Sequence, residues 1–238
     1  MNISPFLPLI FILLAFNLLT GHVPFLISAF LQNPLLGLSM AIGLVMGISI
    51  HEASHALVAY RLGDPTAKLS GRLTVNPVAH LDPLGTFALL FLGFGWGKPT
   101  PFDPFNLRNV KRDSALISVA GATSNFIIAT ILSIPYLIAF YSHNLNLSIN
   151  MVYFYLSPII FFNVILGVFN LIPISPLDGF KVLAGILPHD WYEEFMTTER
   201  YGIFILLVLI FTGTIGRILL PIVSAMFTLL MPGFSAPF

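Results

Sequence analysis

The sequence is poor in charged residues and contains no cysteine. Only 8% of its 238 residues are Asp, Glu, Lys or Arg, whereas a soluble domain carries about a quarter. The hydrophobic fraction of 57% also excludes an intrinsically disordered chain, which needs low hydrophobicity. The lack of cysteine excludes disulfides, iron–sulfur clusters and thiolate metal sites. Because the formal net charge is zero, no basic field attracts nucleic acid, and no nucleic-acid partner is expected.

The sequence contains long runs of apolar residues. A helix spans a bilayer with about 20 such residues, so the runs predict an all-α polytopic membrane protein with five to six transmembrane segments. The runs are Ser4–Thr20, Pro34–Tyr60, Ala115–Tyr141, Met151–Leu177 and Tyr201–Met231. The last run is interrupted at 213–217, and the sequence leaves open whether it crosses once or forms a broken helix pair.

Two shorter segments differ from the long runs. Leu84–Gly97 is apolar over only 14 residues and has basic residues on both sides, which favours a re-entrant piece. Ala67–Val75 alternates apolar and polar residues and contains Gly71, which predicts a short β-hairpin or extended strand near the site described below.

Basic residues indicate the orientation of the chain. Seven of the ten lie between the second and third long runs, from Arg61 to Arg112, and basic residues in short loops stay in the cytoplasm. The loop His143–Asn150 carries no Asp, Glu, Lys or Arg and is expected outside, which returns Asp178–Arg200 to the inside. We expect a multi-pass protein of the plasma membrane. Residues 1–238 form one domain, divided into an N-terminal segment (1–33), a core (34–187) and a C-terminal segment (200–231).

His51 and His55 are four residues apart, and Glu52 follows the first of them. On a helix this spacing puts both imidazoles on one face, about one turn apart. Two imidazoles at this spacing bind one zinc ion, and Glu52 is then placed to take a proton from metal-bound water. Ionisable side chains inside a membrane span are costly and mark a functional site. We therefore expect a metal site, and not histidines that only hydrogen-bond within the helix.

A zinc site of this type needs a third protein ligand. The extended metzincin pattern is excluded, because Val58 and Arg61 stand where it requires Gly and His. Four candidates remain, namely His80, Asp82, Asp178 and His189. Asp178 is favoured, since it ends an apolar run broken by two prolines, and irregular backbone at membrane depth lines a cavity. The alternative is that Asp178 only caps a helix.

Three segments carry a resemblance to a known family, namely His51-Glu52-Ala53-Ser54-His55, Asn170-Leu171-Ile172-Pro173 and Pro176-Leu177-Asp178-Gly179. They resemble the site-2 protease family of intramembrane zinc metalloproteases, and most closely its short prokaryotic members without a PDZ domain. The resemblance covers nearly the whole chain after about Gly43, including segments 63–67, 71–74, 76–83, 95–99 and 121–125. Ala122 departs from it, because the family usually has proline there.

The resemblance implies roles for individual residues. His51, His55 and Asp178 would bind one zinc ion per chain, and Glu52 would be the catalytic acid/base. Asn170 would bind the substrate backbone or the oxyanion. His80 and Asn125 are candidates for contacting the substrate or for holding a turn.

These features predict an intramembrane zinc metalloendopeptidase that acts in regulated intramembrane proteolysis. Its substrate would be a single-pass membrane protein or a signal-peptide-like helix, cut near the cytoplasmic side of the bilayer, where the active site opens. The strand-like Ala67–Val75 could capture the unwound substrate by edge pairing. A metal-binding transporter and a non-catalytic scaffold are the alternatives, although neither gives Glu52 a task. The sequence indicates no oligomeric state.

Overall fold

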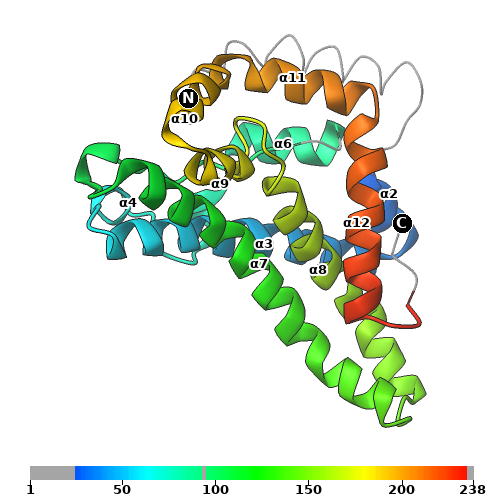
Figure 1. Cartoon of the computed structure of the whole chain (residues 1–238). Coiled ribbons are helices and arrows are strands. Elements are labelled where there is room, and N and C mark those ends of the chain that lie inside the picture. Colours follow the sequence, from blue (N-terminus) through cyan, green and yellow to red (C-terminus); the bar gives the residue numbers. More distant parts are fainter. Residues whose placement is uncertain (1–24, 93–94, 235–238) are drawn as a thin grey trace.

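The computed structural model describes residues 25–92 and 95–234, and this part of the chain is all-helical (Figure 1). The helices are α2 (Phe25–Gln32), α3 (Pro34–Arg61), α4 (Thr66–Leu69), α5 (Pro77–His80), α6 (Pro83–Leu92), η1 (Pro104–Asn106), α7 (Val110–Tyr141), α8 (Leu147–Asn170), α9 (Asp178–Ile186), α10 (His189–Thr197), α11 (Glu199–Phe211) and α12 (Thr214–Leu230). The predicted N-terminal span Ser4–Thr20 lies outside the described residues.

Three of the described helices, α3, α7 and α8, are long and apolar enough to cross a membrane. The bent pair of α11 and α12 raises the number of candidate spans to four, by length and composition. The five to six segments expected from the sequence are therefore not all found in the described residues. These helices make the protein a multi-pass membrane protein.

Asparagine starts each of the three long helices. Asn33, Asn109 and Asn146 are the N-cap residues of α3, α7 and α8. Each accepts a hydrogen bond through its side-chain oxygen from a backbone N–H in the first turn, at 3.2, 3.0 and 2.9 Å respectively. Because these N–H groups have no partner within the helix, the caps fix where each helix begins.

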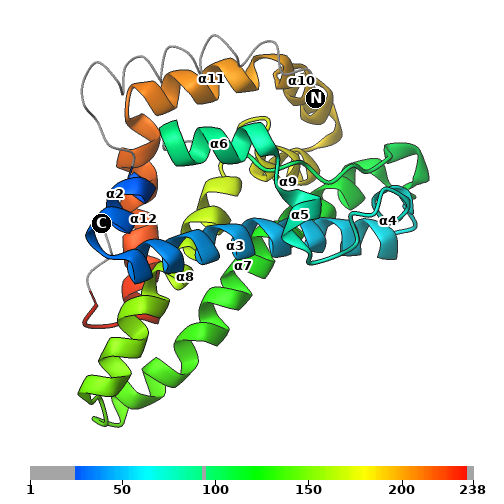
Figure 2. The ribbon, with the colours of Figure 1, turned by 180° about the vertical axis from the view of Figure 1, so that it is seen from behind.

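The three long helices pack against one another and form the frame of the molecule. Helices α7 and α8 form a hairpin, and α3 crosses both of them (Figure 2). Gly43 permits the close approach of α3 to α8, because a Cβ atom there would lie 2.8 Å from the Cα atom of Ile159. The other sides of these helices expose large apolar residues such as Ile131 and Ile138 of α7, which suits contact with lipid.

The C-terminal apolar run is a broken helix pair, which the sequence had left open. Helices α11 and α12 meet at an angle of 78°. Gly213 lies between them in the left-handed region, with φ +69°, which a residue with a side chain adopts only with strain. Helix α12 then packs against α8 through Leu219, Val223 and Phe227, which form one buried face.

The predicted β-hairpin at Ala67–Val75 is wrong, since the described residues contain no strand there. The segment begins inside the short helix α4 and continues as turns. Asp64 lies just before Pro65, the N-cap of this helix, and its Oδ1 accepts hydrogen bonds from the backbone N–H (3.0 Å) and the hydroxyl (2.5 Å) of Thr66, the first helical residue. Alternation predicts a strand only where one face is buried against a partner, and here Leu69 and Val75 are 81% and 67% exposed.

The segment that was expected to be re-entrant leaves the helical frame and returns to it. Helix α6 covers its first part, and residues 93 and 94 lie outside the described chain. Beyond them, Gly97 forms an antiparallel β-bridge with Leu81, and the backbone N–H of Lys98 donates to the carbonyl of His80 at 2.7 Å. The two ends of the segment therefore lie side by side.

Candidate metal centre

His51, His55 and Asp178 come together from two helices that are far apart in the sequence. Oδ2 of Asp178 lies 2.9 Å from Nε2 of His51 and 3.1 Å from Nε2 of His55. The two imidazole rings lie on one face of α3, with centroids 4.6 Å apart and planes at 87°. One potential ligand atom from each of the three residues lies within 4.8 Å of the others. This geometry suits a single metal ion bound by three protein ligands.

The hydrogen bonds on the far side of each ring support a cation in this position. Nδ1 of His55 lies 2.7 Å from the carbonyl oxygen of Ile117, so it must carry the proton and donate. Nδ1 of His51 lies 2.7 Å from the amide oxygen of Asn125 and donates in the same way. In the neutral rings, both Nε2 atoms then present lone pairs to the carboxylate of Asp178. The lone pairs and the carboxylate repel each other unless a cation lies between them. The three residues therefore fit a divalent metal.

Asn125 fixes the orientation of His51. Its side chain is fully buried, and its Nδ2 donates both to the carbonyl of Gly47 and to the amide oxygen of Asn163, each at 3.0 Å. Because both amide protons are used, the amide oxygen is left to accept from His51. Asn125 was a candidate for substrate contact or a turn, and the structure places it behind the metal ligand, on α7.

Gly121 lets α7 approach the histidine pair. A Cβ atom at this position would lie 2.5 Å from Nε2 of His51 and 2.6 Å from Cε1 of His55. Gly121 and Asn125 are four residues apart on α7 and share the helix face that meets α3. A side chain at 121 would therefore occupy the position of the rings.

Asp178 is brought to the site by the turn between α8 and α9. Helix α8 ends at Asn170, and Asp178 is the first residue of α9. Gly179 allows this turn, because a Cβ atom there would overlap the carbonyl groups of Leu171 and Ile172. A carboxylate in the first turn of a helix is also favoured by the helix dipole.

Glu52 lies beside the cluster and is held by the segment that follows the α6 excursion. Its Oε2 accepts a hydrogen bond from the backbone N–H of Thr100 at 2.7 Å. The hydroxyl of Thr100 donates to the backbone carbonyl of Glu52 at 3.0 Å. Thr100 therefore fixes the position of Glu52 at the edge of the metal centre.

The centre lies in a cavity of about 150 Å³. His51, Glu52, His55, Asp178 and Asn170 are among the residues that line it. Asn170 donates its side-chain amide to the carbonyl of Leu166 in its own helix, at 3.0 Å. A second cavity of about 310 Å³ also contacts His51, Glu52 and Asn170, and its other walls are mostly apolar.

The other three ligand candidates lie elsewhere among the described residues. His80 is fully buried, and its Nε2 contacts the carbonyl of Thr74 at 2.7 Å, so it holds the turn before α5. Oδ1 of Asp82 accepts from the backbone N–H of Gly85 at 2.8 Å. His189 is exposed at the start of α10. Of the four candidates, only Asp178 joins the two histidines.

Comparison with known proteins identifies the family. The chain is 36% identical over 203 residues to "Putative zinc metalloprotease YwhC" of Bacillus subtilis, covering 84% of this chain and 92% of the relative. The chain belongs to the site-2 protease family. It is also 28% identical over 180 residues to "Putative zinc metalloprotease Rip2" of Mycolicibacterium smegmatis, covering 74% of this chain and 67% of that protein. The Mycobacterium tuberculosis protein of the same name is 26% identical over 180 residues, or 73% of this chain and 67% of the relative. No family model matches the chain, and no solved structure matches it.

Within this site-2 protease, sequence reasoning missed three supporting residues. Gly121 and Thr100 have no chemistry of their own that marks them, and their roles depend on the approach of separate segments. Lys181, which borders the metal cavity, was also overlooked. Its spacing of three residues from Asp178 could have revealed it, because residues three apart lie on one face of a helix.

Proposed function

We propose that the protein is an intramembrane zinc metalloendopeptidase that hydrolyses a peptide bond in or near a transmembrane helix of its substrate. The observation that supports this most directly is the His51, His55 and Asp178 cluster, with Glu52 beside it, on the frame of long apolar helices. Similarity to zinc metalloproteases over most of the chain agrees with it.

His51, His55 and Asp178 would hold one zinc ion per chain. A bound zinc ion supplies Lewis acidity, which polarises the scissile carbonyl and lowers the pKa of water towards 7. Glu52 is not a ligand in this scheme. Its carboxylate takes the proton of the attacking water and passes it to the leaving amine. Asn170 lines both cavities, which supports its proposed role in hydrogen-bonding the substrate backbone.

The apolar cavity beside the centre provides room for an unwound substrate segment. A helical substrate must first unwind, because its carbonyl groups are occupied by hydrogen bonds within the helix. Gly95, Gly97 and Pro99 line the apolar cavity, and Pro99 and Thr100 line the metal cavity. The excursion that contains α6 therefore borders the path to the metal centre, and we propose that it enters the membrane and returns on the same side.

We propose that the metal centre opens to the cytoplasm and that residues 1–238 act as one membrane-embedded protease domain. Arg61 ends α3 only six residues after His55, and basic residues in short loops remain in the cytoplasm. The substrate is a single-pass membrane protein or a signal-peptide-like helix in the plasma membrane. The lipid bilayer is the other partner.

Glu52→Gln tests this proposal by separating metal binding from chemistry. The variant should keep about one zinc per chain and lose cleavage, because the amide preserves the shape of the side chain but accepts no proton. Zinc is measured by elemental analysis of the purified protein, and cleavage by co-expression with candidate membrane substrates. Asp178→Ala should lose both the zinc and the cleavage activity. Asp190 is exposed on α10, so Asp190→Ala should keep both. Cleavage by Glu52→Gln at the wild-type rate would contradict the proposed role.

A further inference from the structure

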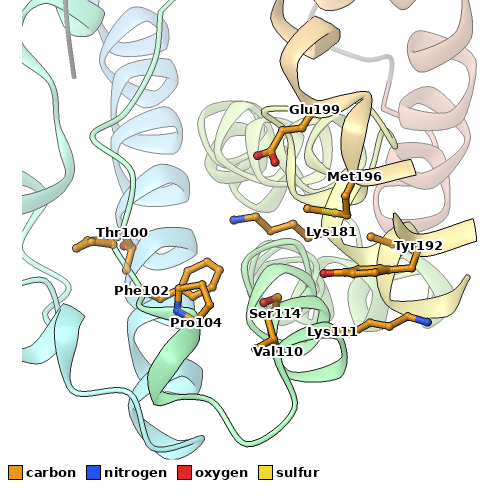
Figure 3. A pocket seen from close by; sticks show the side chains of 12 residues that line it. Thr100, Phe102, Pro104, Val110, Lys111, Ser114, Lys181, Tyr192, Met196 and Glu199 are labelled. Carbon is orange, nitrogen blue, oxygen red and sulfur yellow. The ribbon is translucent and has the colours of Figure 1, made fainter. Parts of the chain in front are cut away.

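A third cavity, of about 420 Å³, adjoins the metal cavity and is named here the flanking cavity. Its walls come from the segment 100–104, the start of α7, helices α9 and α10 and the start of α11 (Figure 3). It shares three lining residues with the metal cavity, namely Thr100, Phe102 and Lys181. A peptide that crosses the metal centre would therefore meet the flanking cavity next.

Lys181 stands at the boundary between the two cavities. It lies three residues after Asp178 on α9, so the two side chains project from the same face of the helix. Its ammonium nitrogen lies 4.4 Å from the centroid of the Phe102 ring. Figure 3 shows the side chain extending into the cavity towards the Thr100 side.

Lys181 lacks a counter-ion of its own. Within the described part of the chain it forms no ion pair, although its side chain is half-buried. Burial lowers the pKa of Lys181, and the carboxylates of Asp178 and Glu199 offset this only in part. A desolvated ammonium group is stabilised by an anion that brings charge-assisted hydrogen bonds.

The second lysine of the flanking cavity is already engaged. The ammonium of Lys111 donates to the carbonyl oxygen of Leu187 and lies 5.4 Å from the Tyr192 ring centroid. In Figure 3 its nitrogen points away from Lys181. Glu199, the acidic residue of the lining, is exposed at the start of α11. The cation available to a ligand in this cavity is therefore Lys181.

We propose that the flanking cavity binds the substrate segment next to the scissile bond and that Lys181 selects a carboxylate in that segment. This inference rests on the proposed protease function. The carboxylate has two sources, an acidic side chain or the new C-terminus that hydrolysis creates. Tyr192, Met196 and Phe102 provide the apolar contacts for the rest of the segment.

Peptide binding tests the proposal without relying on cleavage. The probes are fluorescein-labelled peptides of five leucines followed by a Gly-Ser segment. Asp, Asn or Lys replaces each residue of the Gly-Ser segment in turn. All of these peptides have a C-terminal amide. A second set is truncated after each of the same positions in turn, so that each peptide ends there in a free carboxylate. Binding to zinc-loaded Glu52→Gln protein in detergent is followed by fluorescence polarisation.

The Glu52→Gln protein that retains Lys181 should bind one carboxylate-bearing peptide about tenfold more tightly than the uncharged counterpart of that peptide. Lys181→Met should remove this difference while keeping zinc and thermal stability, and Lys181→Glu should reverse it in favour of lysine peptides. Lys111→Met is the matched control and should keep the carboxylate preference. Preference within the amide series identifies an acidic side chain, whereas preference for the truncated acids identifies the new C-terminus.

Three results would overturn the inference, namely no peptide binding, no carboxylate preference, or a preference that persists in Lys181→Met. They are distinguishable from failure of the proposed function. Substrate cleavage without a carboxylate preference rejects the role of Lys181 alone. A Lys181-dependent preference in a protein that cleaves none of the co-expressed substrates leaves the binding site standing and rejects the protease activity.

Discussion

At the scale of single residues, the candidate metal centre depends on groups other than its three candidate ligands. His51 and His55 each use Nδ1 to donate to a buried oxygen, which leaves Nε2 facing Asp178. The acceptor for His51 is a side chain, Asn125, and that for His55 is a backbone carbonyl, that of Ile117. Of these two acceptors, only the one for His51 can be removed by substitution.

Asn125→Ala should weaken zinc binding by about 10- to 100-fold, the usual effect of losing the partner that orients a metal ligand. The physical reason is that His51 loses the acceptor that fixes its tautomer and ring orientation. Zinc affinity is measured by competition with a chelator. Ser124→Ala is the control, because Ser124 donates to the carbonyl of Gly121 and does not contact the histidines. Equal zinc affinity in the two variants would show that Asn125 does not act through His51.

At the scale of helices, the site is made by close approach of α7 to α3 and by the loops that join the frame. Gly121 places the backbone of α7 against both imidazole rings. Just beyond the C-terminus of α3, Asp64 accepts hydrogen bonds from Thr66, from the backbone of Asp103 and from the side chain of Asn106. Asp64 thus ties the end of α3 to the segment that carries Thr100.

Gly121→Ala should displace the histidine rings and abolish zinc binding, because the added Cβ atom would lie 2.5 Å from Nε2 of His51. Gly216→Ala is the matched control, since α12 has open space at this position. Alanine is a better helix former than glycine, so the control should keep or slightly raise the unfolding temperature. Zinc content and thermal unfolding are measured for both. Full zinc content in Gly121→Ala would show that α3 and α7 can separate without loss of the site.

Low pH should weaken the hydrogen bonds that Asp64 accepts. Burial alone would raise the pKa of Asp64, but the hydrogen bonds from Thr66, Asp103 and Asn106 outweigh it, and the pKa lies below its ordinary value. A lowered folded-state pKa stabilises the protein at pH values above the unfolded pKa of about 3.9, and this stabilisation is lost as the pH falls through the folded-state pKa.

Asp64→Ala should therefore lower the free energy of unfolding by about 1–3 kcal/mol at neutral pH, since it removes the hydrogen bonds that Thr66, Asp103 and Asn106 donate to the buried carboxylate. The difference from wild type should shrink on acidification below pH 4. Thermal unfolding in detergent at a series of pH values measures it. A difference that stays constant down to the lowest pH would mean that the charge of Asp64 contributes nothing.

At the scale of the whole molecule, the arrangement of the helices separates two ends. The loop between α7 and α8 lies far from α4 and from α9, at the opposite end of the hairpin (Figure 1). The end that carries the metal centre is also the end with the basic residues Arg61, Lys111 and Lys181. The positive-inside tendency therefore supports the proposed opening of the centre to the cytoplasm.

Single cysteines test this orientation, because the native chain has none. Asn144→Cys, in the exposed loop between α7 and α8, should react with an impermeant thiol reagent added to intact cells. Ser70 and Phe105 are also exposed but lie at the metal-centre end, so Ser70→Cys and Phe105→Cys should react only after lysis. Labelling of Phe105→Cys in intact cells would mean that the excursion containing α6 crosses the bilayer, and the cytoplasmic position would be wrong.

The sequence by itself determined the membrane class and the histidine pair of the candidate metal centre. Few charges and long apolar runs leave no soluble fold, and the spacing of His51 and His55 on a helix fixes a pair of imidazoles on one face. Asp178 was the favoured third ligand because it ends an apolar run that two prolines break. These conclusions depend on local periodicity and on the cost of burying charge, which are properties of the chain itself.

Only the tertiary structure decided what surrounds the centre. The alternation in Ala67–Val75 predicted a strand, but among the described residues no segment pairs with it as a strand, and it begins within the short helix α4 instead. The roles of Asn125, Gly121 and Thr100 arise from contacts across 48 to 78 positions of sequence or from the close approach of two helices. Such contacts depend on how helices pack, and no local pattern encodes them.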